Sequence, residues 1–234
     1  DLAKRFGIDE KNVGFGGRLH LTIGALGSGA KAAATFHPGH PGPDGKLVQA
    51  INLTNTKGDG TVLHEWTHGL DHFLGKDVQA RSLLLRWLKT GVPSVAAVEA
   101  RAKQFLVDGW FYKGMKKEFG DDKVALAQYA LRVHPHRGET AYKQNADKLG
   151  ADYWGNDAEL LARAFEAWGG DTLGFTDDYL VNANWSGDGN VTKAKGFRGT
   201  PYPTGSERQA FNEVIEAFVK SIKWDNGQPS VAAK

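Results

Sequence analysis

Hydrophobic and polar residues follow two different patterns along the chain. Up to about residue 60, short runs of β-forming residues are separated by turns rich in glycine and proline, which indicates strands. From residue 61 onward, apolar residues recur every three or four positions, which indicates helices with one buried face. The pattern predicts strands at 18–23, 32–36 and 47–53, and helices at 61–74, 78–89, 94–107, 122–133, 139–148, 157–168 and 207–223.

This order of elements predicts an α+β fold. We expect a small mixed or antiparallel sheet in the N-terminal third, packed on the helix at 61–74 and followed by a mostly helical part. We interpret the chain as one domain, in which residues 1–75 supply the sheet and this helix and residues 76–234 form a helical subdomain. Two helix starts carry a capping-box pattern, Asn156 with Glu159 and Ser206 with Gln209.

Composition narrows the functional classes. A 234-residue chain with 41% hydrophobic and 24% charged residues is typical of a soluble globular protein, and no apolar run of about 18 residues is present to cross a membrane. The chain has no cysteine, which excludes a thiolate zinc site. A net charge of +2 gives little support for a nucleic-acid partner, so we interpret the basic stretch around Lys193, Lys195 and Arg198 as a solvated loop. The first residues lack the apolar core of a signal peptide, and we favour a cytoplasmic location.

The strongest chemical signal is the sequence His64-Glu65-Trp66-Thr67-His68, which lies in the predicted helix at 61–74. Residues four apart lie on the same face of a helix, so both imidazoles can reach one metal ion, and neutral imidazole is a good ligand for zinc. Glu65 lies beside the pair, where it can take a proton from water at the metal. At 100° per residue, the apolar and polar residues of this helix fall on opposite arcs. The apolar arc contains Val62, Leu63, Trp66, Leu70, Phe73 and Leu74, and the polar arc contains His64, Glu65, His68, Asp71 and His72.

A catalytic zinc usually takes three protein ligands, and this helix supplies only two. His72 follows His68 by four residues, but it lies about 12 Å along the helix axis from His64, so the two cannot share one ion. Asp71 is better placed as a carboxylate that accepts a hydrogen bond from a ligand imidazole.

The third ligand is therefore expected from another element. The predicted helix at 157–168 has one polar face, which either meets solvent or lines a cleft. On that face Glu159 and Arg163 are four residues apart, and an exposed ion pair at this spacing contributes only tenths of a kcal/mol. The same face carries two candidate ligands, Glu159 and Glu166, and spacing alone does not decide between them.

The chain resembles a known class of metallopeptidases. The helix with His64-Glu65-x-x-His68, followed by a second helix with Glu159-x-x-Ala162-Arg163-x-Phe165-Glu166, is similar to the glutamate zincins, in which the first Glu of such a helix is the third zinc ligand. More closely, the chain resembles the zincin-like domain associated with large polyvalent proteins of phages and mobile elements. That resemblance rests on ordered blocks from about residue 14 to the C-terminal helix, including Gly17-Arg18-Leu19-His20-Leu21, Ile51-Asn52-Leu53-Thr54, Gly58-Asp59-Gly60, Tyr153-Trp154, Tyr179-Leu180-Val181-Asn182 and Pro201-Tyr202-Pro203-x-Gly205. The stretch 186–200 is a departure from the family pattern.

The resemblance implies a zincin fold, a Zn²⁺ cofactor and a predicted metalloprotease that acts on a protein or peptide substrate. The implied ligands are His64, His68 and Glu159, with Glu65 as general base. The tetrahedral oxyanion needs a donor besides the metal. Related zincins often place a tyrosine shortly before the third ligand, so Tyr153 is our candidate, with Tyr142 second.

Two further expectations concern the context of the site. The predicted strand at 32–36 can serve as the sheet edge on which an extended substrate adds as a strand. Parent proteins of the family are often delivered into a recipient cell, so other domains of a longer chain are expected partners and the recipient's cytoplasm is an expected location. The alternative is a catalytically silent zincin-like module that binds or supports other parts of a delivered polyprotein. An intact Glu65 argues against it, because a purely structural site needs no general base.

Overall fold

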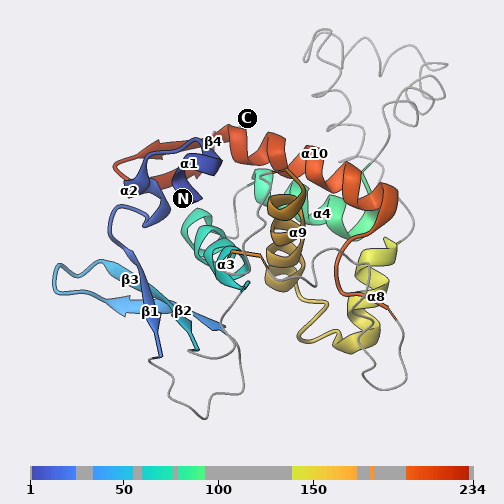
Figure 1. Cartoon of the computed structure of the whole chain (residues 1–234), viewed down its shortest axis with the longest axis horizontal. Coiled ribbons are helices and arrows are strands. Elements are labelled where there is room, and N and C mark those ends of the chain that lie inside the picture. Colours follow the sequence, from blue (N-terminus) through green and yellow to red (C-terminus); the bar gives the residue numbers. More distant parts are fainter. Residues whose placement is uncertain are drawn as a thin grey trace, which may run out of the picture.

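The computed structural model describes residues 2–24, 34–54, 60–75, 79–92, 139–172, 180–181 and 199–231. These residues form a mixed α+β structure with two small sheets (Figure 1). The predicted helices at 94–107 and 122–133, the basic stretch around Lys193 and the start of the predicted strand at 32–36 lie outside the described residues. Within the described part of the chain, every helix is too short or too polar to cross a membrane.

The N-terminal sheet is mixed, as predicted. It comprises β1 (Leu19–Ile23), β2 (Ala34–Pro41) and β3 (Leu47–Leu53) in the order β1-β3-β2, with β1 parallel and β2 antiparallel to the central β3. Alternate residues of β3 are buried, since successive side chains of a strand point to opposite faces. The buried ones are Gln49, Ile51 and Leu53.

Helix α3 (Val62–Leu74) packs against the buried face of this sheet and contacts both β2 and β3. It ends at Gly75, whose φ of 79° is the left-handed conformation that glycine adopts without strain. Its apolar side is held by Leu63, Trp66 and Leu70, all buried. Gly69 permits the close approach of the preceding chain, because a Cβ there would lie 3.0 Å from Cε2 of Phe15.

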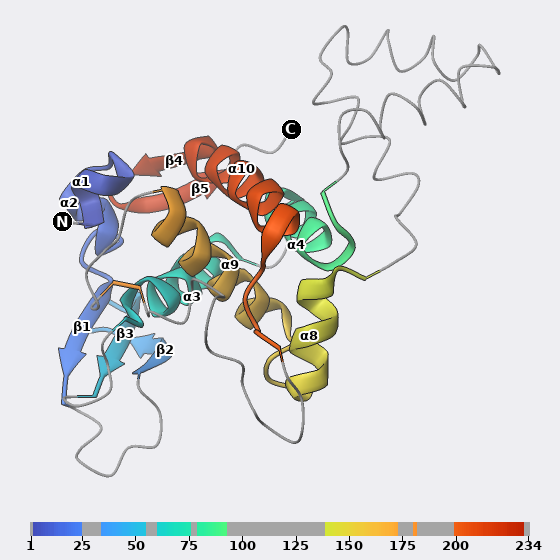
Figure 2. The same ribbon diagram turned by 45° about the vertical axis from the view of Figure 1, so that its right-hand side comes forward.

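The remaining helices cover the side of α3 that faces away from the sheet. Helix α9 (Asp157–Thr172) packs against α3 on one side and against α10 (Gly205–Ser221) on the other (Figure 2). Helix α4 (Gln79–Thr90) contacts α9, α10 and α8 (Ala141–Gly150). Because α9 is covered on all sides, every residue from 159 to 170 is buried, polar ones included.

The two ends of the described chain form a layer that the sequence did not predict. Short helices α1 (Leu2–Phe6) and α2 (Glu10–Val13) lie beside a hairpin of β4 (Ile222–Asp225) and β5 (Gln228–Val231). The helix predicted at 207–223 ends two residues earlier, where β4 begins. The signal for this hairpin was available: the central pair Asn226-Gly227 has φ values of 48° and 80°, as a type I′ turn requires.

Neither of the two predicted capping boxes forms in full. The Asn156 side chain accepts a hydrogen bond from the Glu159 backbone N–H at 2.9 Å, which confirms half of the first box, but the Glu159 carboxylate contacts His64, His68 and Arg163 instead. By contrast, α10 already begins at Gly205, so Ser206 lies inside the helix and not at its N-cap. The acidic residue of that turn, Glu207, instead caps α8 by accepting the backbone N–H groups of Ala141 and Tyr142 at 2.9 and 3.1 Å.

Candidate metal centre

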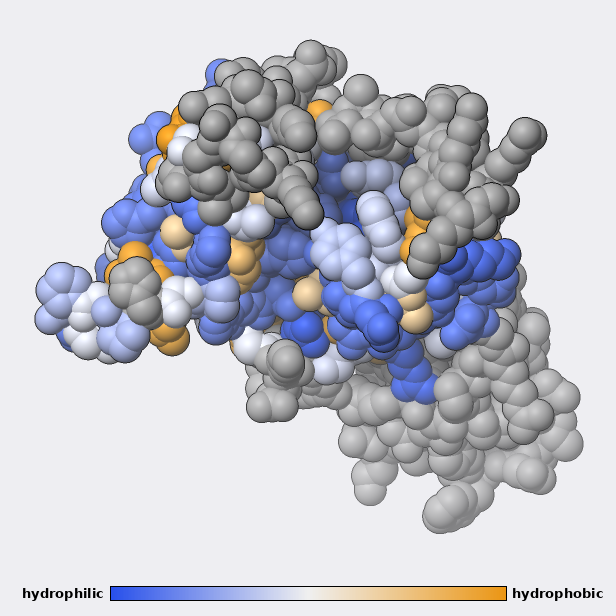
Figure 3. Space-filling model, turned by 90° about the horizontal axis from the view of Figure 1, so that it is seen from below, coloured by the Kyte–Doolittle hydropathy of each residue, from blue (hydrophilic) through white to orange (hydrophobic). Residues whose placement is uncertain are grey.

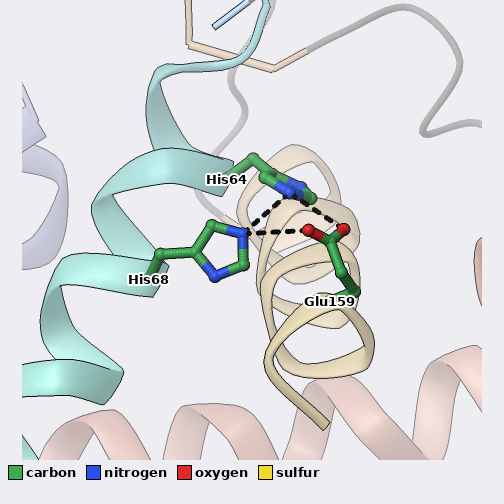
Figure 4. A group of neighbouring side chains, drawn as sticks. All are labelled: His64, His68 and Glu159. Carbon is green, nitrogen blue, oxygen red and sulfur yellow. Dashed lines mark hydrogen bonds and ion pairs between the residues drawn. The ribbon is translucent and has the colours of Figure 1, made fainter. Parts of the chain in front are cut away.

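His64, His68 and Glu159 meet between α3 and α9, with their side chains directed toward one another (Figure 4). The Nε2 atoms of the two imidazoles are 3.2 Å apart. One oxygen of Glu159 lies 3.4 Å from Nε2 of His64, and the other lies 3.4 Å from Nε2 of His68. All three side chains are mostly buried, with 11–15% of their surface exposed. Two helices distant in sequence therefore bring three metal-ligating groups together.

The spacing of these three groups fits a zinc ion. Zinc–nitrogen and zinc–oxygen bonds of about 2.0–2.1 Å in tetrahedral geometry place neighbouring ligand atoms about 3.3–3.4 Å apart. The two Nε2 atoms, 3.2 Å apart, are close to that value, and each of them lies 3.4 Å from a different oxygen of Glu159. Two imidazoles and one carboxylate are also a ligand set of catalytic zinc, which keeps its fourth position open for water or substrate.

Glu166 lies on the other side of the His64 ring. Its Oε2 is 3.5 Å from Nδ1 of His64, the nitrogen that points away from Glu159. The two ring nitrogens diverge, so a carboxylate at Nδ1 is placed to orient the ring and not to share an ion at Nε2. The geometry therefore favours Glu159 over Glu166 as the third ligand, and it gives Glu166 the supporting position.

The charges of α9 strongly affect His64. Burial lowers the pKa of this imidazole, but hydrogen bonds to Glu159 and Glu166 and the charges of both carboxylates outweigh it and raise the pKa to about 10. Burial raises the pKa of Glu159 in turn, yet contacts with His64, His68 and Arg163 bring it well below its usual range. An anionic Glu159 is the form that ligates a metal, and a metal at His64 would replace the proton on Nε2.

Glu65 has the environment of a general base. It is 8% exposed, and burial raises its pKa above that of an ordinary carboxyl, while the nearby imidazoles partly oppose the shift. A carboxyl with a raised pKa accepts a proton more readily near neutral pH. The residue predicted as base thus lies beside the ligands in a dry environment.

Arg163 holds the α9 side of the site together. It is 1% exposed, and its guanidinium donates to Oε2 of Glu159 at 2.9 Å, to the Pro201 carbonyl at 3.1 Å and to the Trp154 carbonyl. It also lies over the Trp154 ring, 5.1 Å from the centroid. The planar fork of arginine suits such divergent acceptors. The pair predicted as a weak exposed contact is therefore buried and links α9 to two other segments.

The role predicted for Asp71 is not the one that the structure shows. Both oxygens of Asp71 accept hydrogen bonds from Arg81 of α4, one from Nε and one from Nη2 at 2.8 Å. Arg81 is itself buried, and Asp71 raises its pKa through the hydrogen bond. Asp71 joins α3 to α4, and Glu166 is the carboxylate that faces a ligand imidazole.

The two tyrosines predicted as oxyanion donors differ in availability. Tyr142 is 1% exposed, and its hydroxyl donates to the Leu160 carbonyl at 2.7 Å, so it is committed to the core. Tyr153 is 58% exposed. Partial burial and the charges of Glu159 and Glu65 raise the pKa of its phenol, which keeps it protonated.

The edge strand β2 borders the site. Among the described strands β2 has only β3 as a neighbour, so its other edge is unpaired within the described residues. The Phe36 ring of β2 lies 6.2 Å from the rings of both His68 and His72. Seen from below, the side of the molecule that holds the sheet and α8 is mainly hydrophilic, with small apolar patches over the strands (Figure 3).

Sequence reasoning missed two residues at the site, Tyr202 and Phe36, and the burial of the polar face of α9. The spacing of Glu159, Arg163 and Glu166 at i, i+4 and i+7 did mark one face of a helix, but not its burial. Tyr202 was part of a family block without a role, and nothing in its sequence neighbourhood indicates the Glu166 carboxylate that its hydroxyl contacts. Phe36 could be found only from the position of β2 beside α3.

Comparison with known families supports part of this description. The model of the family described as large polyvalent protein-associated domain 1 matches residues 145–225. Searches of curated proteins and of solved structures gave no match. The matched segment contains Glu159, Arg163, Glu166 and Tyr202, and it leaves out the two histidines of α3. The comparison thus associates the α9 half of the site with large polyvalent proteins.

Proposed function

We propose that the chain is a zinc-dependent metallopeptidase with a zincin-like fold, in which His64, His68 and Glu159 hold the metal. The observation that carries this proposal is that the Nε2 atoms of His64 and His68, 3.2 Å apart, each lie 3.4 Å from one of the two oxygens of Glu159, beside a buried Glu65. A structural zinc site has four protein ligands and no general base, whereas three ligands with a neighbouring carboxyl are typical of a hydrolytic site.

The residues of the chain divide the chemistry of peptide hydrolysis among them. Zinc, when bound, acts as a Lewis acid that polarises the scissile carbonyl and acidifies water. Glu65 takes the proton from the attacking water and passes it to the leaving amine, and the raised pKa of its buried carboxyl suits both steps. Tyr153, six residues before Glu159 and exposed, is the proposed donor of a phenolic hydrogen to the developing oxyanion.

The edge strand β2 suits an extended peptide. A substrate chain can add to the edge of β2 that is left open among the described strands, by backbone hydrogen bonds that recognise the main chain without regard to sequence. The Phe36 side chain of β2 lies beside the His68 ring, where it would contact a substrate side chain close to the scissile bond. Proteins or peptides in extended conformation are therefore the proposed substrate class.

The association with large polyvalent proteins supports a place in a longer polypeptide. In the proposed setting the peptidase domain acts on proteins in the cytoplasm of a cell that receives the parent chain. Other domains of that parent are the proposed partners, and self-cleavage between them is one activity to look for.

Glu65→Gln is the variant that tests this function. It keeps the size of the side chain and one accepting oxygen but removes the base, so cleavage of a peptide library should fall by about 10²–10⁴-fold. Metal analysis should still find about one zinc per chain, because Glu65 is not a ligand. Glu213→Gln, an exposed change on α10, is the matched control and should leave cleavage unchanged.

Two outcomes would count against the proposal. Equal cleavage by the parent and Glu65→Gln would contradict the assigned base. Zinc binding without cleavage by either protein would support the alternative, a silent zincin-like module.

A further inference from the structure

The contact of Tyr202 with Glu166 has no role in the reaction proposed above. The Tyr202 hydroxyl donates to Oε2 of Glu166 at 2.9 Å, and the same oxygen lies 3.5 Å from Nδ1 of His64. Glu166 is 1% exposed, so protein groups take the place of water around its carboxylate. The three side chains form a line from the segment 199–203 to the candidate metal ligand.

These contacts can determine which nitrogen of the His64 imidazole has the lone pair that binds a metal. A neutral imidazole carries its proton on one nitrogen and a lone pair on the other. A carboxylate that accepts from Nδ1 keeps the proton there and leaves the lone pair on Nε2, the atom that faces Glu159 and His68. The position of Glu166 therefore affects how well His64 binds a metal.

The hydroxyl of Tyr202 holds the Glu166 carboxylate in place. Other contacts hold the segment 199–203, which carries Tyr202. Pro201 and Pro203 are buried, and Arg163 donates to the Pro201 carbonyl. The segment is therefore anchored without the Tyr202 hydroxyl. Burial and the charge of Glu166 raise the pKa of the Tyr202 phenol well above its ordinary value, so it remains a hydrogen-bond donor.

We propose that Tyr202 is a positioning residue for the metal site and acts through Glu166 on His64. The inference rests on the proposed zinc site, and it adds a contact from a segment outside both ligand-bearing helices. If the hydroxyl had a purely structural role, its removal would lower only the free energy of unfolding. With a positioning role, its removal lowers the affinity of the site for the metal.

The test is the zinc affinity of Tyr202→Phe, measured by competition with a chelator. Loss of the hydroxyl should weaken zinc binding by about tenfold, the lower end of the effect of outer-shell partners. Thr140→Val is a matched control, since the buried hydroxyl of Thr140 donates to the Leu88 carbonyl at 2.7 Å, between α4 and the start of α8. It should leave the zinc affinity unchanged, although each variant loses a similar buried hydrogen bond.

A double-mutant cycle identifies the route. If Tyr202 acts through Glu166, Tyr202→Phe should weaken zinc binding in the parent and have no further effect in Glu166→Ala. Equal affinity of Tyr202→Phe and the parent, or fully additive effects in the cycle, would overturn the inference and leave the proposed function standing. A parent protein that binds no zinc would overturn both. Should Glu166→Ala fail to fold, the comparison of Tyr202→Phe with Thr140→Val still decides.

Discussion

Helices α3 and α9 supply the two sides of one candidate site in opposite ways. Helix α3 has an apolar side against the core, and its two histidines face the site. Helix α9 is buried on all sides from 159 to 170, so its polar groups are paired with one another and with neighbouring segments. The histidines of α3 follow from local spacing. The role of each polar residue of α9 depends on tertiary contacts. Removing a polar residue of α9 should therefore lower the free energy of unfolding more than removing one of α3.

The largest expected effect is that of replacing Arg163. It tests whether the burial of an ion pair determines how much the pair stabilises the fold. Arg163→Ala removes a buried cation from Oε2 of Glu159 and the donor to the Pro201 and Trp154 carbonyls, which should lower the free energy of unfolding by about 3–5 kcal/mol. Chemical denaturation of the metal-free protein measures this loss. Lys220 and Glu216 have the same i, i+4 spacing on α10, but Lys220 is 73% exposed, so Lys220→Ala should cost no more than about 0.5 kcal/mol. Similar losses from the two variants would refute the comparison.

A smaller effect is expected at Asp71, on the α3 side. Asp71→Asn removes the charge that pairs with Arg81 and should lower the free energy of unfolding by about 1–3 kcal/mol. Zinc affinity should stay within about twofold of the parent, because the contact joins α3 to α4 and not to a ligand. A loss of about 10–100-fold in zinc affinity would restore the sequence-based role of Asp71 beside an imidazole.

The same contrast explains how far sequence reasoning reached. The strands β1 and β3 and the helices α3, α4, α8 and α9 were predicted within a few residues, since periodicity and turn residues are local signals. The hairpin of β4 and β5 was missed because the apolar stripe of α10 continues into it without a break. Its Asn226-Gly227 turn was the overlooked signal.

For the site, local spacing pointed to His64, Glu65 and His68 but left both Glu159 and Glu166 open, and the family resemblance implied Glu159. Spacing could not make that choice, because it depends on the direction in which each carboxylate faces the His64 ring, which is a tertiary property. The assignment of Asp71 failed for the same reason. Its position on the polar arc was read correctly, but its partner, Arg81, comes from another helix.

The central claim is that two helices build one metal site, and zinc affinity of Glu159→Ala tests it most directly. A ligand should contribute more than an outer-shell partner, so this variant should bind zinc more than about 100-fold more weakly than the parent in chelator competition. Asp157→Asn, two residues earlier on α9 and 47% exposed, is the matched control and should bind zinc like the parent. If Glu159→Ala retains the zinc affinity of the parent, the histidines of α3 bind metal without α9 and the two-helix site is contradicted.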